Sequence, residues 1–106
     1  MARRRVVITG LGIVSPVGNT VEEAWQNILA GKSGISAVTK FDTSTFPVQF
    51  AGEVKNFDIT QYISAKDARR MDDFIHFGLA AGIQAVRDAG LDNEGTADPE
   101  RVGVAI

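Results

Sequence analysis

Apolar and polar residues along this chain form patterns that predict strands near both ends and helices between them. The first apolar run covers residues 6–14, is rich in β-branched residues and is apolar on both faces. This pattern is typical of a fully buried central strand. A second apolar run at residues 102–106 predicts another strand, and Ser, Pro and Gly at residues 15–19 predict a turn.

Capping residues predict two of the helices. Thr20 and Glu23 have the spacing of a capping box, so we expect a helix to begin there and to end at Gly31. Ser64 is placed to cap a short helix over residues 65–70.

Helical periodicity predicts the longest helix over residues 72–89, ending at Gly90. This helix is apolar around most of its circumference, which predicts burial by neighbours on several sides. Its plausibly polar strip consists of Asp73, His76, Ala80, Gln84 and Arg87.

The remaining segments read as connections. Residues 32–50 resemble an insertion that crosses the surface, with a short strand expected at 49–54, and residues 58–63 and 91–99 are a connector and a polar loop. The order of elements predicts an α/β layered fold. A parallel sheet needs several strands and two covered faces, whereas this sequence offers two good strands. We therefore expect residues 1–106 to be one incomplete domain that opens a longer α/β protein.

Composition narrows the class of protein. With 44% hydrophobic and 23% charged residues, the chain resembles an ordinary soluble globular protein, and a net charge of −2 gives no overall attraction to nucleic acid or anionic membrane. The absence of cysteine excludes disulfides, zinc–thiolate sites and a cysteine nucleophile within these residues. No apolar run is long enough to cross a bilayer, and glycine and proline interrupt the apolar stretch that follows three N-terminal arginines. We expect a cytoplasmic protein with no membrane insertion and no nucleic-acid partner.

Gly10-Leu11-Gly12 after an apolar run invites comparison with a dinucleotide-binding turn. The sixth position of that motif is Ser15, however, and the next helix begins only at about Thr20, too late to direct its N-terminus at a phosphate. The glycines are better explained by close packing of a neighbouring helix or strand. No cofactor and no metal are expected.

Several blocks together resemble one family. "RRVVITGLGIVSPVGNT", "FAGEVKNFD", "ISAKDARRMDDFIHFGLAAGIQAVRDAGL" and "RVGVAI" resemble, in this order, the start of the β-ketoacyl-acyl-carrier-protein synthases, and best the elongating type II enzymes of bacterial fatty-acid synthesis. The resemblance covers all 106 residues. It implies a thiolase-like fold of two similar α/β halves, each with a mixed five-stranded sheet, and a homodimer. This chain would be the first part of the N-terminal half.

The resemblance also implies a reaction. The family moves an acyl chain from acyl carrier protein to a cysteine and condenses it with malonyl carrier protein, and two histidines assist the decarboxylation. The chain has no cysteine, and its single histidine, His76, lies on the polar strip near Asp73. We interpret His76 as an exposed or hydrogen-bonded surface residue, so these residues supply no catalytic group and should be inactive alone.

Three cations are candidates for partner binding. Lys66, Arg69 and Arg70 have i, i+3 and i+4 spacing, which places them on one face of the short helix. In the family, basic residues at the matching positions receive the acidic helix of acyl carrier protein. The alternative is a solvated face partly neutralised by Asp67 and Asp72.

Other functions remain open at this point. Within the family, the chain could come from a polyketide ketosynthase or its cysteine-less chain-length partner. Outside it, the alternatives are a non-catalytic module that binds carrier protein and a nucleotide-binding α/β domain. Phe74 and Phe77 could belong either to the core or to a dimer interface.

Overall fold

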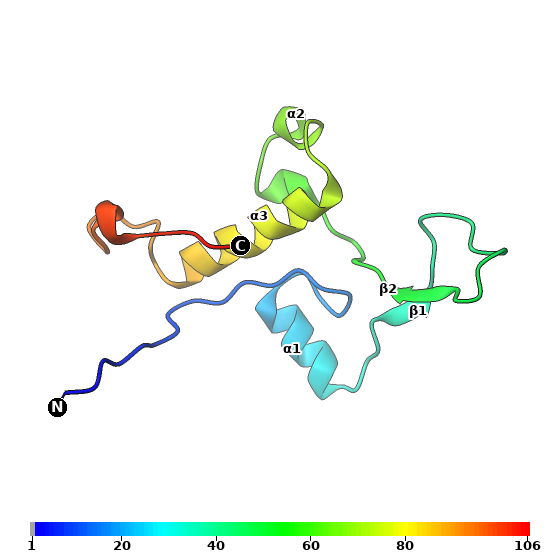
Figure 1. Cartoon of the computed structure of the whole chain (residues 1–106), viewed down its shortest axis with the longest axis horizontal. Coiled ribbons are helices and arrows are strands. Elements are labelled where there is room, and N and C mark those ends of the chain that lie inside the picture. The colour runs from blue at the N-terminus through cyan, green and yellow to red at the C-terminus, as the bar shows by residue number, and fades with distance from the viewer. Residues whose placement is uncertain (1) are drawn as a thin grey trace.

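The structure is a computed structural model that describes residues 2–106 (Figure 1). The described residues form three α-helices, two strands and two 3₁₀ helices. In chain order these are α1 (Val21–Leu29), β1 (Ile35–Ala37), β2 (Phe50–Gly52), η1 (Ile59–Gln61), α2 (Ala65–Ala68), α3 (Asp73–Asp88) and η2 (Pro99–Arg101).

Helix α1 begins and ends as its capping residues predict. The Thr20 hydroxyl accepts a hydrogen bond from the Glu23 amide at 3.2 Å, and the Glu23 carboxylate accepts one from the Asn19 amide at 3.2 Å. The first bond satisfies an amide that the first turn of the helix leaves free, and the second binds the residue that precedes the N-cap. Gly31 follows the C-cap with φ 71°, the left-handed conformation that ends many helices.

Helices α2 and α3 are confirmed, with shifted ends. The Ser64 hydroxyl accepts a hydrogen bond from the Asp67 amide at 3.1 Å, as expected for an N-cap. Helix α2 ends at Ala68 rather than at residue 70, because the backbone continues from there as tight turns. Helix α3 begins one residue later and ends one residue earlier than predicted, and Gly90 with φ 72° follows it.

The sheet consists of one short antiparallel pair. The strand predicted at 49–54 is present as β2, and it pairs with β1, which the sequence did not predict. The register places Ile35 opposite Gly52 and Ala37 opposite Phe50. A three-residue strand within a Gly- and Ser-rich segment has too few positions to show an alternating pattern.

The predictions of strands at residues 6–14 and 102–106 are wrong for this structure. Neither segment belongs to a ladder, and Val6, Val7 and Ile8 are 94%, 65% and 82% exposed. The backbone of the first segment is instead bound by side chains of α3: the Leu11 amide donates to the Asp88 carboxylate at 2.9 Å, and the Ile13 amide donates to the Gln84 side chain at 3.2 Å. A strand forms only where a second backbone supplies partners, and none of the described residues does so here.

The glycines at positions 10 and 12 lie against the backbone of α3, as the sequence predicted. A Cβ atom at Gly12 would collide with the Ala81 carbonyl oxygen and would lie 2.8 Å from the Ala85 nitrogen. A Cβ at Gly10 would collide with the Ala85 carbonyl oxygen. The close approach of the helix accounts for both glycines. In Figure 1 the N-terminal segment runs along α3 on the side that faces α1.

The predicted burial of α3 on several sides is wrong within the described residues. Phe74 is 71% exposed, whereas Ala80, assigned to the polar strip, is completely buried. Gln84 of the same strip faces the interior, where its side-chain nitrogen donates to the Asn19 carbonyl at 2.7 Å and to the Tyr62 hydroxyl at 3.0 Å. The polar strip of α3 binds backbone and side-chain groups of neighbouring segments. The apolar face of the same helix remains uncovered.

The described residues bury little apolar surface. Ala24, Ala68 and Ala80 are the hydrophobic residues classed as buried, and the accessible surface is 8761 Å². A compact protein of this mass exposes roughly 5,700 Å². The radius of gyration is 17.5 Å, against about 13 Å for a compact domain of this length. Hydrogen bonds and close backbone contacts hold these segments together far more than a hydrophobic core does.

The two phenylalanines of α3 have different environments. Phe77 packs edge-on against Phe57 with ring centroids 5.2 Å apart, and Phe57 stacks on Tyr62 at 6.3 Å. Phe74 lies on the exposed side of the helix. Phe77 therefore belongs to the packing of this chain, and Phe74 is free to contact other polypeptide.

The contact between Gly12 and α3 predicts a large effect of one added methyl group. Gly12→Ala should lower the free energy of unfolding by about 3 kcal/mol or more, because neither of the two backbones can move aside without breaking hydrogen bonds. Gly95→Ala is the matched control: its φ of 79° costs about 1 kcal/mol, but no atom lies within 4 Å of the new Cβ. Chemical denaturation measures both, and equal losses would contradict the packing described here.

Candidate functional site

The candidate binding surface consists of Lys66, Arg69 and Arg70, which we call the basic patch. Lys66 lies in α2, Arg69 is its C-cap and Arg70 follows in the next turn, where its amide donates to the Asp67 carbonyl at 3.1 Å. All three residues are exposed, and α2 lies at one edge of the molecule beside α3 (Figure 1). The three cations thus lie in α2 and in the turn that directly follows it.

The acidic neighbours do not neutralise the basic patch through ion pairs. Among residues 2–106, Lys40 forms an ion pair with Asp73 at 3.3 Å, and His76 Nδ1 lies 3.8 Å from the same carboxylate. No residue of the basic patch takes part in an ion pair with Asp67, Asp72 or any other described residue. The cations are therefore available to an acidic partner.

His76 lies directly behind the basic patch. Its side chain is 13% exposed, and Nε2 lies 2.9 Å from the carbonyl oxygen of Ala68, the last residue of α2. The ring belongs to the first turns of α3, so this contact joins the two helices. The prediction that His76 is hydrogen-bonded is confirmed, but its side chain is largely covered rather than on the surface.

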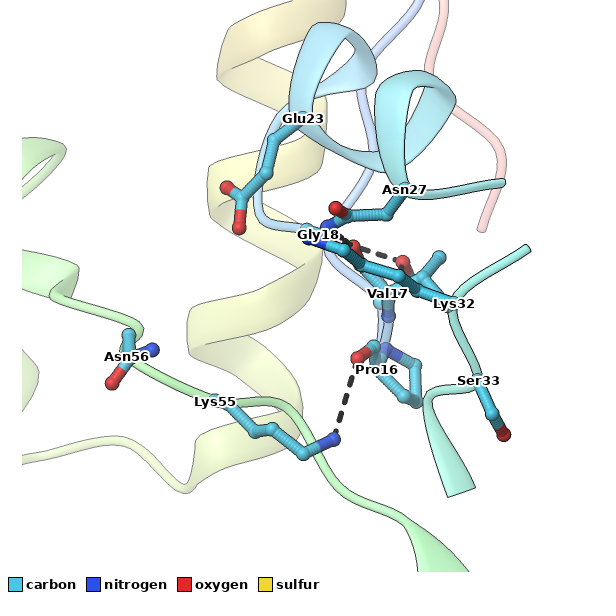
Figure 2. Close-up of a pocket in the computed structure, with 10 residues that line it drawn as sticks. Pro16, Val17, Gly18, Glu23, Asn27, Lys32, Ser33, Lys55 and Asn56 are labelled. Atoms are coloured by element: carbon cyan, nitrogen blue, oxygen red, sulfur yellow. Dashed lines mark hydrogen bonds between the residues drawn. The ribbon is translucent and has the colours of Figure 1, made fainter. Parts of the chain in front are cut away.

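A polar pocket lies where the turn at residues 15–18 meets α1 and the end of β2 (Figure 2). It has a volume of about 220 Å³. Among its lining residues is Lys55, which makes several hydrogen bonds. The Lys55 ammonium donates to the carbonyl oxygens of Pro16, Gly34 and Glu53 at 3.3, 3.1 and 3.0 Å. An ammonium has three protons to donate, so Lys55 has none left for an anion. Its role is to join the turn to the β1–β2 hairpin.

Two open apolar grooves flank the helices. One, of about 540 Å³, lies along α3 and includes Phe74, Leu79, Ile83 and Val104. The other, of about 350 Å³, lies between residues 11–13 and α1 and includes Trp25. Exposed apolar surface of this kind is usually covered by other polypeptide.

Among the described residues, no group of three or more His, Cys, Asp or Glu side chains could hold a metal ion. In the same part of the chain, no helix has the length and apolar character needed to cross a membrane.

Several residues that organise the site were not singled out from the sequence as important. The sequence pattern places Gln84 on a polar strip and Lys40 in an apparent insertion, and it gives Lys55 no special position. A glutamine among the mainly apolar residues of a helix signals a hydrogen bond to a neighbouring segment. No comparable signal exists for Lys40 or Lys55, because their partners are distant backbone or side-chain groups.

Comparison with known proteins identifies the family to which the chain belongs. The chain matches the family described as beta-ketoacyl synthase, N-terminal domain, over residues 3–106, and it belongs to that family. Its fold is also that of a solved thiolase-like structure titled "The ishigamide ketosynthase/chain length factor", with a TM-score of 0.71 and 39% identity. That match covers 84% of this chain and 22% of the other.

The relatives indicate which ketosynthase the chain is similar to. It is 59% identical to the 3-oxoacyl-[acyl-carrier-protein] synthase 2 of Vibrio cholerae, 51% identical to that of Coxiella burnetii and 47% identical to that of Synechocystis. Each of these matches covers the whole of this chain and 25% of the relative. The chain thus spans about a quarter of the length of the curated relatives it matches.

Glu53 fixes the loop that joins the strands. Its carboxylate accepts hydrogen bonds from the Thr39 amide and hydroxyl, each at 3.0 Å, and from the Lys40 amide at 3.3 Å. Desolvation raises the pKa of Glu53, but these hydrogen bonds and the Lys40 charge together lower it by more, so the pKa lies below its usual range.

The lowered pKa predicts how the hairpin responds to acid. Because the folded-state pKa of Glu53 lies below the unfolded value, its bonds contribute stability above the unfolded pKa, and this stability is lost as the pH falls through the folded pKa. A carboxyl ¹³C titration should place the Glu53 midpoint below that of an unfolded peptide. In Thr39→Ala, which removes the hydroxyl donor, the midpoint should move upward. A wild-type midpoint in the usual glutamate range would refute the assignment.

Proposed function

We propose that this chain is the N-terminal quarter of a 3-oxoacyl-[acyl-carrier-protein] synthase that extends fatty acyl chains. The observation that carries the proposal is the 47–59% identity, over the whole chain, to relatives with that name. The reaction is a decarboxylative Claisen condensation: malonyl carrier protein loses CO₂, and the resulting carbanion attacks the acyl thioester. The product is a 3-oxoacyl thioester.

In this proposal, residues 1–106 contribute binding and scaffold rather than reaction chemistry. The chain has no cysteine, and His76 is engaged with a backbone carbonyl. The nucleophile and the two histidines of the reaction would be supplied by the remaining polypeptide, and the segment alone would be inactive.

The basic patch is the part of this chain that would meet acyl carrier protein. An exposed cationic surface on a protein of net negative charge attracts an acidic partner locally and orients it as it approaches. The absence of ion pairs at Lys66, Arg69 and Arg70 supports this role, since the charges need not be released from other partners first.

The exposed apolar surfaces support the same proposal. Further polypeptide would form a mixed five-stranded sheet with this segment in the N-terminal half of a thiolase-like fold. Further polypeptide would cover the groove along α3, and Phe74 would face either the rest of the subunit or the second subunit of a homodimer. The cytoplasm, where type II fatty-acid synthesis takes place, is the proposed location.

The structural neighbour favours a second candidate, a ketosynthase or chain-length factor of a polyketide pathway, because its title names those two proteins. Its 39% identity is lower than the 47–59% of the curated relatives, so fatty-acid elongation is preferred. A free-standing module that only binds carrier protein is the remaining alternative.

The function is tested with the full-length protein that carries this sequence. The protein is incubated with acyl carrier protein that bears a saturated acyl chain and with malonyl carrier protein. It should release CO₂ and form the 3-oxoacyl product, which mass spectrometry detects. No product with any saturated acyl chain, together with retained binding of carrier protein, would support the module instead.

Charge reversal at Arg69 and Arg70 tests the basic patch. In the full-length protein the double change to Glu should raise KM for acyl carrier protein about tenfold at low salt and less at moderate salt, with little change in kcat. The control for the single change Arg69→Glu is Lys32→Glu. Lys32 is an exposed cation near α1, and its replacement by Glu should leave KM for acyl carrier protein unaltered. Equal KM values in the double variant and the wild type, at both salt concentrations, would exclude the patch.

A further inference from the structure

Helix α2 is too short to hold its own position. It has four residues, whereas isolated helices in water are marginal below about 12–15 residues. Its single buried residue is Ala68, at its C-terminal end. The placement of the basic patch must therefore depend on contacts between α2 and its neighbours.

A side-chain hydrogen bond from α3 reaches the C-terminal end of α2. The last carbonyls of a helix have no partner within it, and the Ala68 carbonyl is satisfied by the Met71 amide at 3.2 Å and by His76 Nε2 at 2.9 Å. The first bond is local, so the imidazole makes the side-chain hydrogen bond that ties this carbonyl to α3. The second ring nitrogen lies 3.8 Å from the Asp73 carboxylate, too far for a hydrogen bond.

Arg69 directly follows Ala68, the residue whose carbonyl accepts the bond from His76. Arg69 and Arg70 follow Ala68 in the chain, and their side chains have no ion pair among the described residues that would fix them independently. A shift of the Ala68 carbonyl therefore shifts the origin of both guanidinium groups. A partner that binds a preformed arrangement of charges loses less conformational entropy than one that binds mobile charges.

We propose that His76 is a positioning residue for carrier-protein docking, acting through the Ala68 carbonyl on Arg69 and Arg70. This inference rests on the proposed function, because it assumes that the basic patch receives acyl carrier protein. His76 does not touch the partner; it fixes the end of the helix from which two of the contacting side chains emerge.

The test compares three changes at His76 in the full-length protein. His76→Ala and His76→Phe remove the hydrogen bond, the second with the ring volume retained, and should raise KM for acyl carrier protein roughly fivefold with kcat unchanged. His76→Gln keeps a side-chain donor and should restore KM to within twofold of the wild type. With an acyl thioester of a small thiol in place of acyl carrier protein, all variants should match the wild type, which a general loss of folding would not allow.

The outcomes separate this inference from the proposed function. If His76→Phe and His76→Gln have the same KM for acyl carrier protein, the hydrogen bond has no positioning role. The inference alone fails if His76→Ala leaves KM unchanged while Arg69→Glu raises it. If Arg69→Glu also leaves KM unchanged, the docking role of the patch and the role of His76 fail together. Should His76→Ala not fold, the comparison of Phe with Gln decides the question.

Discussion

The direct contact between α3 and the backbone at Gly10 and Gly12 is the constraint on which the other contacts of this chain depend. With no side chain at either glycine, the helix approaches until its own carbonyl oxygens lie where Cβ atoms would be. At this distance Gln84 and Asp88 reach the amides of Ile13 and Leu11, and Gln84 also binds the Asn19 carbonyl ahead of α1. One crossing of two backbones thus sets the position of α3 relative to the N-terminal segment and to α1.

Helix α3 in turn contacts the segment that carries the basic patch. Its first turns carry His76, which binds the end of α2, and Phe77, which packs on Phe57 before η1. Gln84, Asp88, His76 and Phe77 of α3 each contact a neighbouring segment, whereas Lys66, Arg69 and Arg70 make no ion pair with another described residue.

The helices could be predicted from the sequence, and the pairing of the strands could not. Thr20, Glu23 and Gly31 act within one or two turns of α1, so their effect is local and visible in the spacing. The close packing at Gly10 and Gly12 could also be predicted, because the alternative nucleotide motif lacked its third glycine and its helix. Whether residues 6–14 form a strand depends on a second backbone, however, and local pattern alone contains no information about it. Spacing and a family resemblance predict the basic patch, whereas the bonds from Lys55 to the Pro16 and Gly34 carbonyls join positions 39 and 21 residues apart and leave no local signature.

The N-terminal segment has a consequence for biosynthesis. The bond between Leu11 and Asp88 spans 77 positions, so at synthesis rates of 5–20 residues per second the glycines wait roughly 4–15 s for the helix that covers them. Val6, Val7 and Ile8 stay exposed even after α3 has packed on the glycines, so this β-prone stretch is open to association with other chains until further polypeptide covers it. Three consecutive arginines precede it directly. Flanking charges of one sign discourage intermolecular pairing of such stretches.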